Sequence, residues 1–162
     1  TLIKKKKINA LSMTPLFVKN TIIINAPVAK VWDALTNPAQ TKKYMFGCEA
    51  ISDWRKGSPL TWEMIYEGKP FVAVKGTIMD IETNKRLVYT TIDPHSTIED
   101  EPENYLTVTY LLTTENGKTT LTVTQGDYTK VADGERRYTE AYNNGEGWNP
   151  ILVQIRKMLE PY

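Results

Sequence analysis

The stretch NGEGWNPILVQIRKMLE, residues 144–160, carries two opposing signals about its own conformation. Apolar residues recur at helical spacing along its second half: Trp148, Ile151, Leu152, Ile155, Met158 and Leu159. This spacing predicts a helix that packs one face against a core. The first half holds Gly145, Gly147 and Pro150. Inside a helix a Gly costs about 1 kcal/mol relative to Ala, and a Pro costs about 3 kcal/mol. The segment therefore predicts a C-terminal helix that is disturbed beside Trp148.

Upstream of this segment, most of the chain reads as strands separated by turns. Runs rich in β-branched and aromatic residues span 18–26, 50–54, 58–68, 71–82, 86–92, 105–115 and 118–128. The turn sequences EGKP, ETNK and ENGK separate several of these runs. Asn116-Gly117 is the strongest hairpin signal, because a type I′ turn requires positive φ at both central residues. These short connections predict an antiparallel meander.

The strands alternate so that one face of the sheet is covered and the other is exposed. In the run 58–68, one face carries Leu60, Trp62, Met64 and Tyr66, and the other face is polar. The run 118–128 alternates leucine and valine with threonine in the same way. The covered face needs helices, and the C-terminal segment from about residue 133 can supply one. Two shorter helices are predicted to begin at the prolines 27 and 38, so the fold class is α+β.

Composition excludes several functional classes. The chain has 162 residues and a net charge of +1, which suits a single domain without the basic excess of a nucleic-acid-binding protein. No apolar run approaches the roughly 18 residues of a membrane-spanning helix. Cys48 is the only cysteine, so no internal disulfide can form. We therefore expect a cytoplasmic monomer or homodimer with no nucleic-acid or membrane partner.

The N-terminus begins with a short segment that differs in character from the rest of the chain. Its four consecutive lysines, at residues 4–7, suit a solvated chain end better than an anion-binding site. The stretch from Met13 reads like the opening of a domain. We expect residues 1–12 to be an N-terminal extension without function and residues 13–162 to form the domain.

Three motifs, in this order, resemble the START-like (SRPBCC) superfamily. They are TIIINAPVAKVWDALTNP at 21–38, GTIMDIETNKRLVYT at 76–90 and GEGWNPILVQIRKMLE at 145–160. More narrowly, the chain is similar to the family of the C-terminal domain of the activator of the 90-kilodalton heat-shock chaperone ATPase. We expect the bacterial single-domain type, because the eukaryotic activators carry a separate N-terminal chaperone-stimulating domain. The resemblance implies a helix-grip fold, in which a curved antiparallel sheet of six to seven strands wraps around a long C-terminal helix. Two short helices follow the first strand.

The resemblance also offers a reason for the mixed signals at the C-terminus, because it places Gly147 and Trp148 in the middle of the gripped helix. A residue without Cβ lets the helix backbone approach the sheet, while the adjacent indole fills the space under its curve. Pro150 then either kinks the helix or restarts it, with Asn149 as the cap. Of these alternatives we expect the kink.

No constellation of catalytic residues stands out. His95 is the only histidine, so two histidines cannot share a metal. Asp93 could orient His95 as a base, or Cys48 and His95 could pair as nucleophile and base. A solvated histidine and a structural cysteine are the commoner roles for such residues. We expect no catalytic residue, metal or cofactor. A cyclase-like enzyme stays an alternative, since relatives in the superfamily include cyclases and hydroxylase components.

Aromatic residues are concentrated on the strands and the final helix, and the resemblance implies a cavity between them. We expect Trp62, Tyr66, Tyr89, Tyr142 and Trp148 to contact an apolar or aromatic ligand there. For each ring alone, packing in the core is the alternative. The leading functional interpretation is a small-molecule binding domain with a small hydrophobic ligand as its partner. The other is a protein-interaction module that contacts a chaperone.

Overall fold

The computed structural model describes residues 14–160. The expected extension at 1–12, with its four lysines, lies outside the described residues. The strands within the described part are β1 (Val18–Ile24), β2 (Glu49–Ser52), β3 (Pro59–Tyr66), β4 (Lys69–Glu82), β5 (Arg86–Thr91), β6 (Leu106–Glu115) and β7 (Lys118–Gly126). The helices there are α2 (Val28–Thr36), α3 (Pro38–Tyr44), α4 (Gly134–Tyr142) and α5 (Asn149–Leu159). Single 3-10 turns lie at Pro102–Asn104, Tyr128–Lys130 and Asn143–Gly145.

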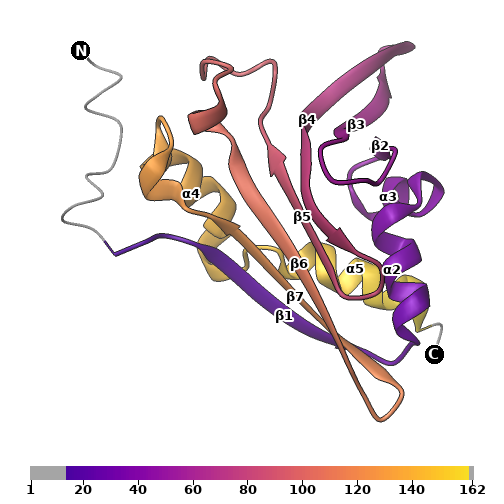
Figure 1. Ribbon diagram of the computed structural model, residues 1–162. Coiled ribbons are helices and arrows are strands. Elements are labelled where there is room, and N and C mark those ends of the chain that lie inside the picture. The colour runs from indigo at the N-terminus through magenta and orange to yellow at the C-terminus, as the bar shows by residue number, and fades with distance from the viewer. Residues whose placement is uncertain (1–13, 161–162) are drawn as a thin grey trace.

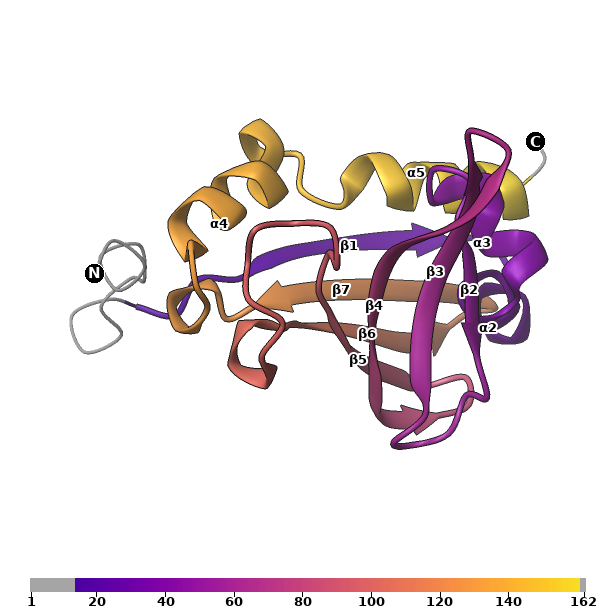
Figure 2. The ribbon, with the colours of Figure 1, turned by 90° about the horizontal axis from the view of Figure 1, so that it is seen from above.

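All these strands belong to one antiparallel sheet with the order β1-β7-β6-β5-β4-β3-β2. The sheet curves without closing, so β1 and β2 remain its edges (Figure 1). Seen from above, α4 and α5 follow one another along the concave side of the sheet, beside β1 (Figure 2). The seven strands described, the two short helices after β1 and the C-terminal helix confirm the predicted α+β helix-grip fold.

The main core lies between α5, α2 and the sheet. Ile24 of β1, Leu35 of α2 and Leu121 of β7 share it with Leu152 and Ile155 of α5, and each of these side chains is at most 2% exposed. The period of two along β1 and β7 brings their apolar side chains to one face, and the helical period does the same for α5. A smaller cluster around Val18, Leu106, Tyr128 and Val131 lies at the α4 end of the sheet.

The C-terminal segment forms two helices, so the prediction of one helix kinked at Pro150 is wrong. Left-handed backbone follows α4, with φ of 48° at Asn143, 55° at Asn144 and 51° at Gly147. Asn and Gly are the residues that enter this region most readily. These residues end α4 before Pro150 is reached. The second helix then starts with Pro150 in its first turn and with Trp148, not Asn149, at the N-cap.

Candidate functional site

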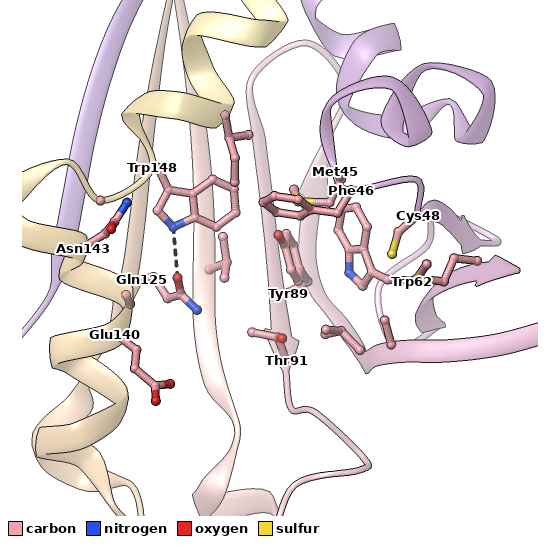
Figure 3. A pocket seen from close by; sticks show the side chains of 17 residues that line it. Met45, Phe46, Cys48, Trp62, Tyr89, Thr91, Gln125, Glu140, Asn143 and Trp148 are labelled. Carbon is pink, nitrogen blue, oxygen red and sulfur yellow. Dashed lines mark hydrogen bonds between the residues drawn. The ribbon is translucent and has the colours of Figure 1, made fainter. Parts of the chain in front are cut away.

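A cavity of about 500 Å³ lies between the concave face of the sheet and the α4–α5 segment (Figure 3). Its lining is mainly apolar and aromatic: Met45, Phe46, Cys48, Trp62, Met64, Ala73, Val74, Tyr89, Val108, Ala141, Gly147, Trp148 and Ile151. Polar side chains enter the lining at Thr91, Gln125, Glu140 and Asn143. Cavities of roughly 300–1,000 Å³ with apolar walls and a few polar groups are typical of small-molecule sites.

Three of the five predicted ligand contacts, Trp62, Tyr89 and Trp148, line this cavity. Ring contacts connect them across the sheet. The Trp62 and Tyr89 ring centroids are 6.0 Å apart, and Tyr110 lies 5.4 Å from Tyr89 and 6.0 Å from Trp148. The alternating pattern of the strands brings Trp62 and Tyr89 to the concave face, and Trp148 approaches them from the start of α5.

The other two predicted contacts, Tyr66 and Tyr142, are not among the lining residues. Tyr66 is 54% exposed at the last position of β3, where its ring contacts Phe71 at 5.3 Å. Tyr142 is 47% exposed and stacks on Tyr138 of α4 at 5.5 Å. Tyr66 is at the end of a hairpin beyond the cavity, and Tyr142 is turned along its own helix.

A β-bulge shapes the wall formed by β4. Trp62 pairs with Val74 and Glu63 pairs with Val72, so Ala73 is an extra residue without a partner on β3. Such a bulge bends the strand and changes the direction of its side chains. Ala73 and Val74, although adjacent, both line the cavity.

Asn20 of β1 fixes the turn that separates α4 from α5. Its Nδ2 donates to the Glu146 carbonyl at 3.2 Å, and its Oδ1 accepts from the Trp148 backbone N–H at 2.9 Å. Gly147 lies between these two contacts, and a Cβ built there would be 2.8 Å from Cγ1 of Val18. The absence of a side chain at Gly147 therefore allows the turn to rest directly against β1.

Gln125 of β7 holds the Trp148 ring at the cavity wall. The indole Nε1 donates to Oε1 of Gln125 at 2.9 Å (Figure 3). Because Trp148 also donates its backbone N–H to Asn20, two amide side chains on neighbouring strands position this residue. The orientation of the indole is thus determined by hydrogen bonds as well as by packing.

The deeper polar groups of the cavity are neutral. The Tyr89 and Tyr110 hydroxyl groups are 2.7 Å apart and share a hydrogen bond, and burial raises the pKa of both above the usual tyrosine value. Burial also raises the pKa of the Cys48 thiol, which favours the thiol over the nucleophilic thiolate. These hydroxyl and thiol groups are therefore uncharged at neutral pH.

The residues considered for catalysis are not brought together at the cavity. His95 is not among its lining residues, since its ring stacks on Phe71 at 4.3 Å and its Nε2 is 2.8 Å from the Val72 carbonyl oxygen. Cys48 lines the cavity without it. Within residues 14–160, no group of three or more His, Cys, Asp or Glu side chains is placed to hold a metal ion. No helix in this range is long and apolar enough to cross a bilayer.

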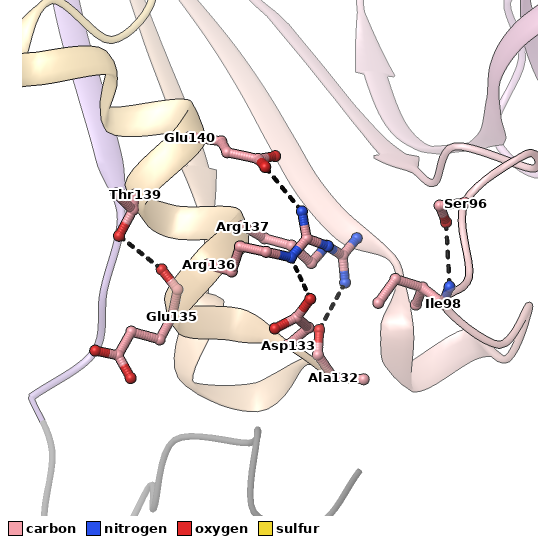
Figure 4. A network of polar contacts seen from close by, with 9 residues as sticks. All are labelled: Ser96, Ile98, Ala132, Asp133, Glu135, Arg136, Arg137, Thr139 and Glu140. Atoms are coloured by element: carbon pink, nitrogen blue, oxygen red, sulfur yellow. Dashed lines mark hydrogen bonds and ion pairs between the residues drawn. The ribbon is translucent and has the colours of Figure 1, made fainter. Parts of the chain in front are cut away.

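A network of polar contacts links the side chains of α4 and the turn before it (Figure 4). Arg136 contacts Asp133 and donates from Nη1 to Oε1 of Glu140 at 2.8 Å. Arg137 donates to the carbonyl oxygens of Ala132 and Asn104 at 3.3 and 3.0 Å. The carboxylate of Glu140, which belongs to the cavity lining, is therefore paired with a cation of its own helix.

Sequence reasoning did not identify Asn20 and Gln125, although a signal for both was present. Both have inward positions in strands of period two: Asn20 is in phase with Val18 and Ile22, and Gln125 is in phase with Leu121 and Val123. A polar residue at an apolar position of such a strand needs a hydrogen-bond partner when it is buried. These two positions were the visible exceptions in their patterns.

Comparison with known proteins agrees with this architecture. The family model for activator of Hsp90 ATPase homolog 1-like proteins matches residues 25–160. The solution structure of a Cytophaga hutchinsonii protein is 33% identical to the chain, covers 92% of it and 97% of that protein, and has a TM-score of 0.70. A search among curated proteins found no match.

Two more distant structures share the fold. A crystal structure from Nitrosomonas europaea is 22% identical over 95% of this chain and 97% of that one, with a TM-score of 0.68. The solution structure of the Aha1 dimer from Colwellia psychrerythraea is 18% identical over 90% of this chain and 96% of that one, with a TM-score of 0.63. These two structures show the fold alone, whereas the family-model match over residues 25–160 and the 33% identical Cytophaga hutchinsonii protein show that the chain belongs to the family of activator of Hsp90 ATPase homolog 1-like proteins.

Proposed function

We propose that this protein binds a small apolar or aromatic molecule in the cavity between the concave sheet face and the α4–α5 segment. The observation that carries the proposal is the cavity itself, with a volume of about 500 Å³ beside a well-packed core. Other hollows of similar volume lie on the surface of the described residues, and this one is distinguished from them by its large apolar and aromatic lining. Such a lining with a few polar groups is typical of small-molecule sites.

The arrangement of the walls indicates what such a ligand must offer. Trp62, Tyr89 and Trp148 present aromatic surface from β3, β5 and the start of α5. Burying one ligand ring contributes roughly 2–3 kcal/mol, whereas micromolar binding requires about 8 kcal/mol. The ligand therefore has to contact several walls and to satisfy at least one polar group.

The proposal can be tested by titration, because two of the cavity-lining residues are tryptophans. We expect saturable changes in tryptophan fluorescence with at least one class of a panel of aromatic, sterol, fatty-acyl and polyketide-like compounds. Native mass spectrometry of the purified protein would identify a retained ligand and give the oligomeric state. The absence of a saturable change with every class would contradict the proposal.

Two variants test whether the cavity is the binding site. Ala73→Phe places a ring in the cavity from β4 and is expected to abolish binding. Tyr66→Ala removes an exposed ring that is not among the lining residues, so its binding should match that of the parent. Unchanged binding by Ala73→Phe would exclude this cavity as the site.

A role in contacting a chaperone is the second candidate, and membership of a family described by Hsp90 ATPase activation supports it. The test is the ATPase rate of a purified 90-kilodalton heat-shock chaperone with and without this protein. Stimulation that persists in Ala73→Phe, together with no ligand binding by the parent, would favour the interaction module over the binding domain.

A further inference from the structure

Gln125 is the amide in an otherwise apolar and aromatic row across the concave face. Pairing between neighbouring strands aligns Val18, Gln125, Val108, Tyr89 and Ile78 in this row. Val108 and Tyr89 line the cavity together with Gln125. The amide therefore faces the same space as the apolar walls, next to the β1 end of the row.

The orientation of this amide is fixed by Trp148. An indole N–H can only donate a hydrogen bond, whereas a Gln side chain has one accepting oxygen and one donating nitrogen. The bond of 2.9 Å from Trp148 Nε1 consequently requires the oxygen of Gln125 to face the indole. In Figure 3 the nitrogen points away from Trp148, toward the side of the cavity on which Tyr89 and Thr91 lie.

The two inward amides differ in how completely they are satisfied. Asn20 uses both its nitrogen and its oxygen in bonds to the α4–α5 turn. Gln125 uses its oxygen, and within residues 14–160 its Nε2 donates to no protein acceptor. A polar nitrogen directed into an apolar cavity is satisfied when the bound molecule supplies an acceptor.

We infer that Nε2 of Gln125 donates a hydrogen bond to the bound molecule and that the cavity selects apolar compounds carrying an acceptor oxygen, such as a ketone or ester carbonyl. This inference rests on the proposed function of the cavity. A hydrocarbon of the same shape leaves the Gln125 N–H groups buried without a partner, and sites built to pair a polar group discriminate strongly against ligands that cannot do so. Gln125 is thus a specificity-determining residue, and Trp148 positions it.

A pair of matched probes tests the inference. Methyl naphthyl ketone and ethylnaphthalene share a ring system and nearly the same shape, and differ in the carbonyl oxygen. Their dissociation constants are measured by calorimetry with the parent, with Gln125→Glu and with Gln125→Met. Gln125→Glu keeps an oxygen for the Trp148 N–H and removes the donor, and Gln125→Met removes the donor without adding charge. Differences in probe hydration cancel when the ratio of the two constants is compared between proteins.

We expect the preference for the ketone over the hydrocarbon to be about tenfold smaller in both variants than in the parent, which is the factor that one lost hydrogen bond of about 1.4 kcal/mol produces. Ethylnaphthalene should still bind both variants. The role of Gln125 would be overturned if both Gln125 variants kept the parent's preference for the ketone, or if Thr91→Val lost it instead. Either result would leave the cavity as a binding site. Failure of both probes to bind the parent would contradict the proposed function and this inference together.

Discussion

The two helices of the C-terminal segment cover the same sheet in different ways. α5 presses Leu152 and Ile155 into the main core, where they are 0% and 1% exposed. Within α4, by contrast, only Gly134 is fully buried, and Tyr138 and Ala141 are partly buried. The cavity lies beneath the turn from Asn143 to Trp148, between the deeply buried helix α5 and the sparsely buried helix α4. The cavity thus coincides with the interruption between the two helices.

The strongest way to break this contrast is to force the turn away from β1. Gly147→Leu adds a side chain whose Cβ would lie 2.8 Å from Val18 Cγ1, at a φ of 51°. Overpacking and a left-handed Leu together should lower the free energy of unfolding by about 3–5 kcal/mol. Urea denaturation measures the loss.

Gly145→Leu is the matched control for this variant. Gly145 also has positive φ, 93°, but the nearest atom to its Cβ position is Tyr142 Oη at 3.7 Å. Gly145→Leu should therefore lower the free energy of unfolding by the cost of a left-handed Leu backbone alone, without the cost of a steric clash. The contact with β1 would be unimportant if the two variants lost the same free energy of unfolding. The same conclusion would follow if Gly147→Leu melted within a degree of the parent.

Adjacent residues on α5 test whether the two parts of the core differ in packing. Leu152→Ala removes a side chain from the closed region and should cost about 2–5 kcal/mol. Ile151 lines the cavity, so Ile151→Ala removes fewer packing contacts and should cost clearly less. Thermal and urea denaturation of both variants supply the comparison. Equal costs would show that the region beside the cavity is packed as tightly as the core under α5.

The attachment of the turn to the sheet can be weakened without adding volume. Asn20→Ala removes both hydrogen bonds to the turn and should lower the free energy of unfolding by about 1–3 kcal/mol. Thr21→Ala, on the exposed face of the same strand, should change stability by less than about 0.5 kcal/mol. A similar stability for the two variants would indicate that packing alone holds the turn.

Measurements of stability at alkaline pH test whether water reaches the buried tyrosine hydroxyl groups. Burial raises the pKa of Tyr44, Tyr89 and Tyr110, so these phenols keep their protons in the folded protein while unfolded tyrosines lose theirs above about pH 10. The unfolded state then binds fewer protons, and stability should fall with rising pH by about 1.4 kcal/mol per pH unit for each buried phenol.

Tyr44→Phe should reduce this slope by the contribution of one group. The variant also loses the 2.7 Å hydrogen bond from Tyr44 to the Ala34 carbonyl, which lowers stability at every pH without changing the slope. Urea midpoints measured between pH 9 and pH 12, which span about two units above the tyrosine pKa, separate the two effects. A slope identical to that of the parent would show that water reaches the Tyr44 hydroxyl.

The fold could be predicted from the sequence because its signals are local and repeat. Alternation in the strands and the Asn-Gly turn specify the meander, and the same alternation placed Trp62 and Tyr89 on the face that lines the cavity. Alternation assigns a side chain to a face of the sheet, but it does not indicate how far along the strand the helices cover that face. Tyr66 has the predicted phase, yet lies at the exposed end of its hairpin.

The turn and the polar groups of the site were harder to predict for different reasons. Gly147 and Pro150 suggested a disturbance of the helix, but the pair Asn143-Asn144, which enters the left-handed region first, was the signal for a complete break. The partners of Asn20 and Gln125 lie 128 and 23 residues away along the chain. Such pairings depend on how the helix docks on the sheet, which no local pattern contains.

The sparse burial of α4 has a consequence for the rate at which the cavity exchanges its contents. A helix held mainly by one tyrosine ring and by arginine contacts at its first turns can separate from the sheet at a low free energy, while α5 separates only when the main core opens. We expect amide protons of α4 to exchange with solvent well before those of α5. The lifetime of a bound molecule would then be set by the opening frequency of α4, and a ligand that contacts Ala141 and Asn143 would slow its own release.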